Sequence, residues 1–193
     1  MRGKWAQGIQ PRNFTWVLKD QVAICERPGG FGSNHRKVRR QEEIIWIRQN
    51  GFDFVLSLCG SNANLHNYEE MGVPFHHVPY SGPAAGQLSL TRAMSSIRDH
   101  VNAGDKIVVH RDQLGERVLG LVAAYLLWME LVPTGPQAIS ITERLFEREL
   151  GQIARETVAL VARCDASIDV PVDAFAHTPP DEIDDGGGED VDD

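Results

Sequence analysis

One short segment combines the residue types that bind anions. Residues 106–110 (KIVVH) are an apolar run that predicts a buried strand, and residues 117–130 predict a long apolar helix. The polar loop between them begins with Arg111, and Arg117 stands where the helix starts. A loop that runs from a buried strand into a helix N-terminus gathers backbone N–H donors at the positive end of the helix dipole. This arrangement predicts a site for phosphate or another oxyanion.

The same segment resembles the signature loop of the protein tyrosine and dual-specificity phosphatases. That signature is an apolar strand, His-Cys, five residues, Arg, and an apolar helix ending near Ala-x-Tyr-Leu. Here His110 is followed by Arg111 at the cysteine position, residues 112–116 fill the spacer, and Arg117 stands at the arginine position. The remaining matches are two glycines and the helix residues: Gly115, Gly120, Ala123, Ala124, Tyr125 and Leu126. The resemblance extends over about residues 15–165.

The resemblance implies that a phosphate cradle is retained, with His110 and Gly120 supporting its loop. The residues that it assigns to phosphate binding are Arg111, Asp112, Gln113, Leu114, Gly115, Glu116 and Arg117. An arginine can give two parallel hydrogen bonds to an oxyanion, and the loop N–H groups require only the right backbone shape.

Two catalytic groups of that family are missing from this chain. The family's nucleophile is a thiolate, and Arg111 cannot replace it because a guanidinium stays protonated and has no usable lone pair. The family's aspartate general acid would be expected near Ser81 or Gly82, and neither is a carboxylate. The resemblance therefore implies a pseudophosphatase that binds a phosphate-bearing or anionic ligand, or a protein partner, in a regulatory role.

Two other functions stay open. The first is a working phosphohydrolase that uses Asp112 or a bound water, with Arg111 and Arg117 stabilising the transferring group. The second is a scaffold whose site is plugged by Arg111 together with Asp112 or Glu116. Charge pairing inside the loop would distinguish an open cradle from a plugged one.

Strands alternate with helices, which predicts an α/β fold with a mainly parallel central sheet flanked by helices, as in dual-specificity phosphatases. A β-hairpin is expected within residues 14–25. Further strands are expected at 52–58, 75–78 and 106–110, and helices at about 36–49, 64–71, 89–102, 117–130, 137–149 and 152–163.

The charge of the chain is concentrated at one end. An extension of residues 1–13 precedes one domain, residues 14–165, and an acidic tail follows as residues 166–193. Residues 181–193 hold eight acids and no base, and the other 19 acids of the chain equal its 19 Lys and Arg. We expect the tail to be disordered, because it cannot bury enough apolar surface to offset its ordering entropy. This balance argues against general nucleic-acid binding.

The remaining composition argues against several other classes of site. The chain has three widely spaced cysteines and no CxxC, which is typical of buried thiols in a reducing compartment, so we expect a cytoplasmic protein. No apolar run approaches the roughly 20 residues that span a bilayer, and we expect no membrane association. The histidines lack partners at metal-ligand spacing, so neither a metal nor a cofactor is expected.

A single basic run, residues 35–40 (HRKVRR), lies in the expected first helix. Its side chains would spread around most of the helix circumference, with Glu42 and Glu43 nearby. The pattern favours a solvated helix face, and the alternative is a docking site for an acidic partner or for the chain's own tail.

Overall fold

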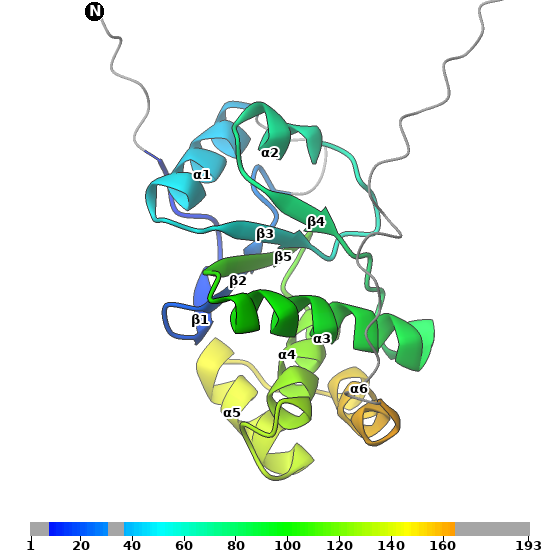
Figure 1. The fold of residues 1–193 in the computed structure, drawn as a ribbon. Helices are drawn as coiled ribbons and strands as arrows, with labels where there is room; N and C mark the ends of the chain where they lie inside the picture. The colour runs from blue at the N-terminus through cyan, green and yellow to red at the C-terminus, as the bar shows by residue number, and fades with distance from the viewer. Residues whose placement is uncertain (1–7, 31–36, 165–193) are drawn as a thin grey trace, which may run out of the picture.

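The computed structural model describes residues 8–30 and 37–164, and its centre is a five-stranded sheet (Figure 1). In spatial order the strands are β1 Thr15–Leu18, β2 Val22–Glu26, β5 Ile107–Arg111, β3 Phe54–Ser57 and β4 Phe75–His77. β1 pairs antiparallel with β2, and the other neighbouring strands pair in parallel. The expected hairpin and the mainly parallel sheet are both confirmed. The expected tail, residues 166–193, lies outside the described residues.

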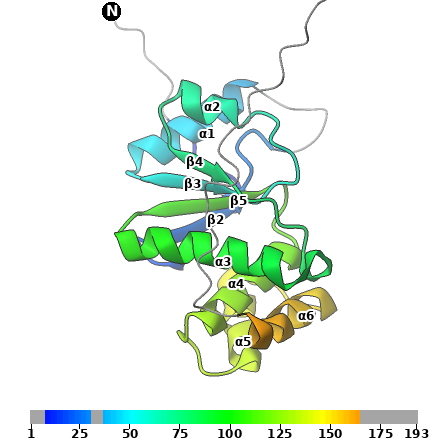
Figure 2. The ribbon, with the colours of Figure 1, turned by 45° about the vertical axis from the view of Figure 1, so that its right-hand side comes forward.

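Helices cover both faces of the sheet, as the two views in Figures 1 and 2 show. One face carries α1 Lys37–Gln49 and α2 His66–Glu70. The other carries α3 Gly86–Ala103, α4 Glu116–Trp128, α5 Gly135–Phe146 and α6 Gln152–Leu160. Two short 3₁₀ turns complete the described elements: η1 Pro83–Ala85 and η2 Val161–Arg163. Among the described residues, no helix is both long and apolar enough to cross a bilayer.

The expected helix 89–102 begins earlier than the sequence indicated. α3 starts at Gly86, because η1 leads straight into it without an intervening loop. Its C-terminus matches the expectation: Gly104 adopts a left-handed conformation, with φ of 86°, and its backbone N–H bonds carbonyls of the last turn.

β5 is the central strand, and its apolar β-branched residues suit a position covered on both faces. Ile107, Val108 and Val109 are fully buried, as expected for a β-branched run covered by helices on both faces. Cys25 of β2 and Ser57 of β3 both stand opposite His110 in the parallel register. The carboxyl ends of these three strands therefore meet at one edge of the sheet. Ligand sites of open α/β sheets lie at such an edge, where connections leave toward opposite faces.

α4 follows β5 after a short loop and is the most buried helix of the domain. A Cβ added at Gly120 would lie 2.8 Å from Cα of Ala154, so only glycine allows α6 to pack this closely on α4. The position of Gly120 is thus set by the α4–α6 contact. This packing holds the N-terminus of α4 behind the loop that follows β5.

Candidate functional site

The loop between β5 and α4 places an uncapped helix N-terminus at the end of the central strand. Arg111 is the last residue of β5, and Glu116 is the first residue of α4. Gly115 stands at the N-cap in an extended conformation, and no side chain caps the helix there. Its carbonyl accepts hydrogen bonds from the N–H groups of Val118 and Leu119. The earlier N–H groups have no acceptor within the helix, which makes this terminus a potential anion site.

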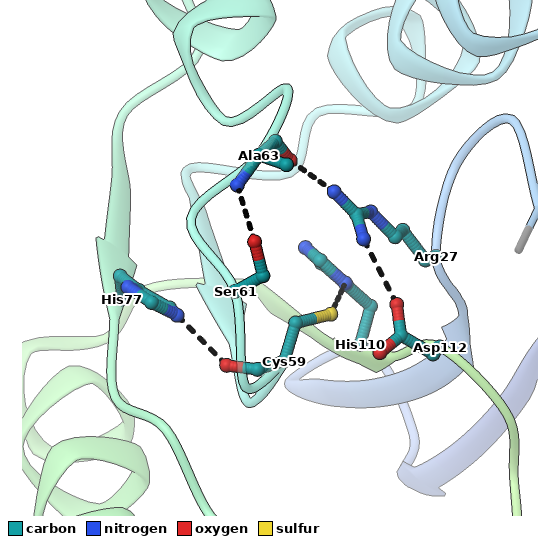
Figure 3. Close-up of polar contacts among 7 residues, drawn as sticks. All are labelled: Arg27, Cys59, Ser61, Ala63, His77, His110 and Asp112. Atoms are coloured by element: carbon teal, nitrogen blue, oxygen red, sulfur yellow. Dashed lines mark hydrogen bonds and ion pairs between the residues drawn. The ribbon is translucent and has the colours of Figure 1, made fainter.

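An ion pair joins the loop to the end of β2 (Figure 3). Arg27 Nη1 lies 2.9 Å from Asp112 Oδ1, and the Arg27 side chain is 8% exposed. A second guanidinium nitrogen of Arg27 donates to the carbonyl of Ala63. Directly after β2, the backbone N–H of Arg27 also donates to the carbonyl of Arg111 at 2.7 Å. Arg27 thus fixes the first residues of the loop through both its backbone and its side chain.

His110 and Cys59 form a buried contact beneath the loop (Figure 3). Cys59 Sγ lies 3.6 Å from His110 Nδ1, within hydrogen-bonding distance for a sulfur atom. Burial lowers the pKa of His110 to about 3, and the nearby positive charge of Arg27 adds to this effect. Burial also raises the pKa of Cys59 to about 11, so its thiol is protonated at neutral pH. Both groups are therefore uncharged at neutral pH, and the role of His110 in supporting the loop stays a prediction.

The rest of the loop is held by the connection between α5 and α6. The carboxylate of Glu116 accepts a hydrogen bond from the N–H of Gly151 at 3.1 Å. Arg148 Nη1 donates to the carbonyl of Leu114 at 2.7 Å, and the Leu114 side chain is buried. Glu116 and Asp112 are therefore both bonded to groups outside the loop. The self-plugged arrangement, in which one of them pairs with a cradle arginine, is not the arrangement that the structure shows.

Arg117 lies against the loop in which the general acid was expected. A Cβ added at Gly82 would be 3.1 Å from Cγ of Arg117, so the two segments touch. Gly82 is buried and has φ of 107°, a conformation that side-chain-bearing residues rarely adopt. Ser81 beside it is exposed. The structure thus brings Arg117 together with this loop, which offers a hydroxyl and a glycine where the family's acid would stand.

Arg111 projects from the end of β5 and is half-buried. Burial raises the pKa of the neighbouring Tyr80 hydroxyl, and the positive charge of Arg111 is among the influences that oppose this rise. Tyr80 precedes Ser81 in the loop of residues 78–83, called the acid-position loop here because the family's general acid was expected in it. The charges of Arg111 and Arg117 therefore both lie next to that loop. Gln113, the remaining candidate, is exposed at the surface of the cradle loop.

Sequence reasoning missed three residues that shape this site: Arg27, Cys59 and Arg148. Arg27 and Cys59 follow buried strands that flank β5, and a charged residue directly after VAICE was a signal that could have identified Arg27. Arg148 could not be located without the tertiary contact between Arg148 and Leu114.

The basic run 35–40 also needs a correction at Arg40. The expected solvated face does not include Arg40, which is 8% exposed and donates to Asn67 Oδ1 at 2.8 Å. Glu43 is 1% exposed and accepts from Arg39 and from the N–H of Gly29. Asn67 and Gly29 hold these two side chains inward, because they lie on segments that pack against α1. His35 and Arg36 lie outside the described residues.

Comparison with known proteins shows which solved structures share this fold. No protein-family model matches the chain, and no curated protein matches its sequence. Solved phosphatase structures do match. Kinase-associated phosphatase, with its catalytic-site cysteine substituted by serine, is 19% identical with a TM-score of 0.61, over 78% of this chain and 93% of that one. Tk-PTP in its active form is 17% identical with a TM-score of 0.60, over 81% of this chain and 98% of that one.

A third match is the core catalytic domain of the PP-IP phosphatase Siw14 from S. cerevisiae, in complex with citrate. It is 16% identical with a TM-score of 0.57, over 79% of this chain and 87% of that one. These neighbours are phosphatases, and this chain has their fold. The resemblance drawn from residues 106–128 is thereby confirmed at the level of the fold.

Proposed function

We propose that this phosphatase-fold domain binds oxyanions, phosphate or a phosphorylated ligand above all, and does not hydrolyse them by cysteine chemistry. The observation that carries the proposal is the position of Arg111. It is the last residue of β5, it follows the buried His110, and it precedes the loop that enters α4. A phosphate at this loop would meet a guanidinium where the family mechanism needs a thiolate.

Replacing a thiolate by a guanidinium changes the electrostatics in favour of binding. A thiolate repels an incoming phosphate dianion, whereas Arg111 and Arg117 both attract it. The uncapped N-terminus of α4 adds backbone donors and a partial positive charge. Because Asp112 and Glu116 are bonded to Arg27 and Gly151, neither carboxylate is committed to neutralising the two cradle arginines.

The composition of the acid-position loop supports the proposal that the family's catalytic chemistry is absent. It has no carboxylate in residues 78–83 (VPYSGP), and its Gly82 touches Arg117. Loss of a general acid typically lowers a rate by about 10²–10⁴, independently of the missing nucleophile. A regulatory pseudophosphatase, which recognises a phosphorylated ligand or a protein partner without turning it over, is consistent with both losses.

The alternative of a working phosphohydrolase depends on Asp112 or on a bound water. Asp112 accepts from Arg27 at 2.9 Å, which holds its carboxylate toward β2 and away from the role of nucleophile. The alternative of a plugged scaffold loses support from the outward bonding of Asp112 and Glu116. Citrate in the complex of Siw14 indicates that a small polycarboxylate is a useful probe here besides phosphate. Three unpaired cysteines support the proposal of a cytoplasmic location.

The test is an NMR titration of the full chain with inorganic phosphate. We expect the amides of residues 111–118 to shift first, with an affinity on the order of millimolar. Arg117→Ala should abolish these shifts, whereas Arg144→Ala, at an exposed arginine of α5, should leave them unchanged. Shifts that cluster elsewhere, or that survive Arg117→Ala, would contradict the proposal. Turnover of an aryl phosphate by the wild-type chain would favour the phosphohydrolase.

A further inference from the structure

The described domain ends close to the proposed oxyanion site. η2 contacts α4, and α6 packs against η1, the turn that follows the acid-position loop. The side chain of Gln87, in the first turn of α3, donates to the carbonyl of Arg163. The last described residues, Arg163 and Cys164, therefore lie beside the N-terminus of α3, where Gln87 is five positions after Gly82.

Tyr80 lies in the core between the last described residues and the end of β5. Its ring is 1% exposed and belongs to the core between the sheet and α4, against which Cys164 also packs. Burial raises the pKa of Tyr80, and smaller influences come from the charge of Arg111 and from the Cys164 thiol. The end of the described chain and the first cradle arginine thus share a neighbour.

The site presents more positive charge than one small anion would need. Arg111 and Arg117 flank the loop, and Arg148 reaches its Leu114 carbonyl from the α5–α6 connection. The acids inside the loop are bonded elsewhere, as described above. In the sequence, the opposite charge lies in residues 181–193, which carry eight carboxylates and no base. Carboxylate oxygens accept hydrogen bonds from guanidinium and backbone N–H groups much as phosphate oxygens do.

The connecting chain is long enough for these two charge clusters to meet. Residues 165–180 separate the end of the domain from the acidic segment, and sixteen residues span up to roughly 50 Å when extended. Tethering through a linker of this length gives the acidic segment an effective concentration on the order of millimolar. Such a concentration matches the affinity expected for a bare anion at the cradle, so a weak contact is enough to compete.

We infer that the acidic segment 181–193 binds in cis to the oxyanion cradle between Arg111 and Arg117 and competes there with phosphate-bearing ligands. The inference rests on the proposed function, since it needs a cradle that binds anions. It assigns the tail, which lies outside the described residues, the role of an internal competitor. A phosphorylated ligand must then displace the tail, which sets a threshold for binding and makes binding depend on ionic strength.

The experiment compares three full-length chains. In the first variant all eight acids of 181–193 are replaced by Asn or Gln, and in the control the same eight are exchanged Asp→Glu and Glu→Asp, which keeps every charge. The dissociation constant for inorganic phosphate is measured by NMR at low salt and again at high salt. We expect the neutralised tail to tighten phosphate binding about twofold at low salt, the charge-preserving tail to match wild type, and high salt to remove the difference.

Any other result of the phosphate titration would contradict either the tail inference or the proposed cradle. Equal phosphate affinity in all three chains, with shifts still centred on residues 111–118, would overturn the tail inference and leave the proposed cradle intact. Failure of all three chains to bind phosphate would overturn the cradle, and the tail inference with it. A tail effect that grows with protein concentration would show that the tail acts on a second copy, which contradicts binding in cis. A tail effect unchanged by Arg117→Ala would place the contact elsewhere.

Discussion

Asp112 of the cradle loop and Arg27 at the end of β2 form an ion pair with 2.9 Å between Oδ1 and Nη1. The pair bridges two segments 85 residues apart in sequence, and its arginine is nearly buried. The carboxylate therefore compensates a charge that is largely shielded from water, and it orients the loop at the same time. An acid that looked in the sequence like a possible catalytic or plugging group has a structural partner.

The first prediction concerns the stability contributed by this pair. Asp112→Asn leaves the Arg27 guanidinium nearly buried without its counter-charge, and we expect a loss of about 1–3 kcal/mol in the free energy of unfolding. Urea denaturation measures it. The control is Asp99→Asn, because Asp99 is 45% exposed and pairs with its neighbour Arg98 at 2.8 Å, where a loss below about 1 kcal/mol is expected. Equal losses in the two variants would mean that burial of Arg27 does not strengthen the pair.

The second prediction concerns the missing nucleophile. Wild type should form no phosphoryl-enzyme with p-nitrophenyl phosphate. Arg111→Cys should gain low but measurable release of nitrophenolate, because Arg117, the loop N–H groups and the dipole of α4 would lower the pKa of the introduced thiol. This leaving group needs little protonation, so the absent acid matters less. Product released per enzyme is measured with Arg111→Ser as the control.

Two outcomes of that experiment carry information beyond the gain itself. Arg111→Cys combined with Arg117→Ala should be inactive, since the anion-binding arginine is gone. If Arg111→Cys were no faster than Arg111→Ser while the fold stayed intact, the loop would lack the geometry of a phosphate cradle. If wild type were as fast as Arg111→Cys, a different nucleophile would have to act near residues 110–117.

The third prediction separates the two positions at which an acid could be restored. Ser81 is exposed and can accept Asp without repacking, whereas Gly82 combines φ of 107° with a Cβ position 3.1 Å from Cγ of Arg117. We expect Gly82→Asp to lose about 1–3 kcal/mol of stability and Ser81→Asp almost none. In the Arg111→Cys background, Ser81→Asp should help mainly substrates with poor leaving groups. Matching thermal unfolding of the two Asp variants would show that the Gly82 conformation is not required.

The fourth prediction concerns pH. The pKa of His110 is about 3 in the folded chain and about 6.5 in an unfolded one, so between these values the unfolded state binds one more proton. Stability contributed by the neutral imidazole is complete above pH 6.5 and is lost as the pH falls toward 3. From pH 8 to pH 5 we expect a loss of about 2 kcal/mol from this group alone.

The measurement is urea denaturation of wild type and His110→Gln at several pH values. Only the slopes against pH are compared, because the substitution itself changes the stability of the buried site. The slope of His110→Gln should be smaller between pH 8 and pH 5. Identical slopes would show that His110 does not titrate on unfolding in this range, and that carboxylates elsewhere cause the whole dependence.

Much of the fold could be predicted from the sequence, because its signals are local. The apolar run Ile107–Val109, the glycine at 104 and the long apolar helix that became α4 each specify their element through neighbouring residues. The order of the strands was not predicted from the sequence, because strand pairing depends on contacts between distant segments. The start of α3 was misplaced, because η1 merges into the helix and no cap residue marks the junction.

The sequence alone shows that position 111 holds an arginine and that residues 78–83 hold no carboxylate, and our proposal that the family's cysteine chemistry is absent rests on these positions. The sequence could not determine whether the cradle is plugged, because that depends on which distant group each acid meets. The tertiary structure shows which groups these acids meet: Arg27 bonds Asp112, and the N–H of Gly151 bonds Glu116. Charge pairing falls off within a few ångströms and ignores chain distance, so the partners of a loop acid become visible only when the strands and helices are packed.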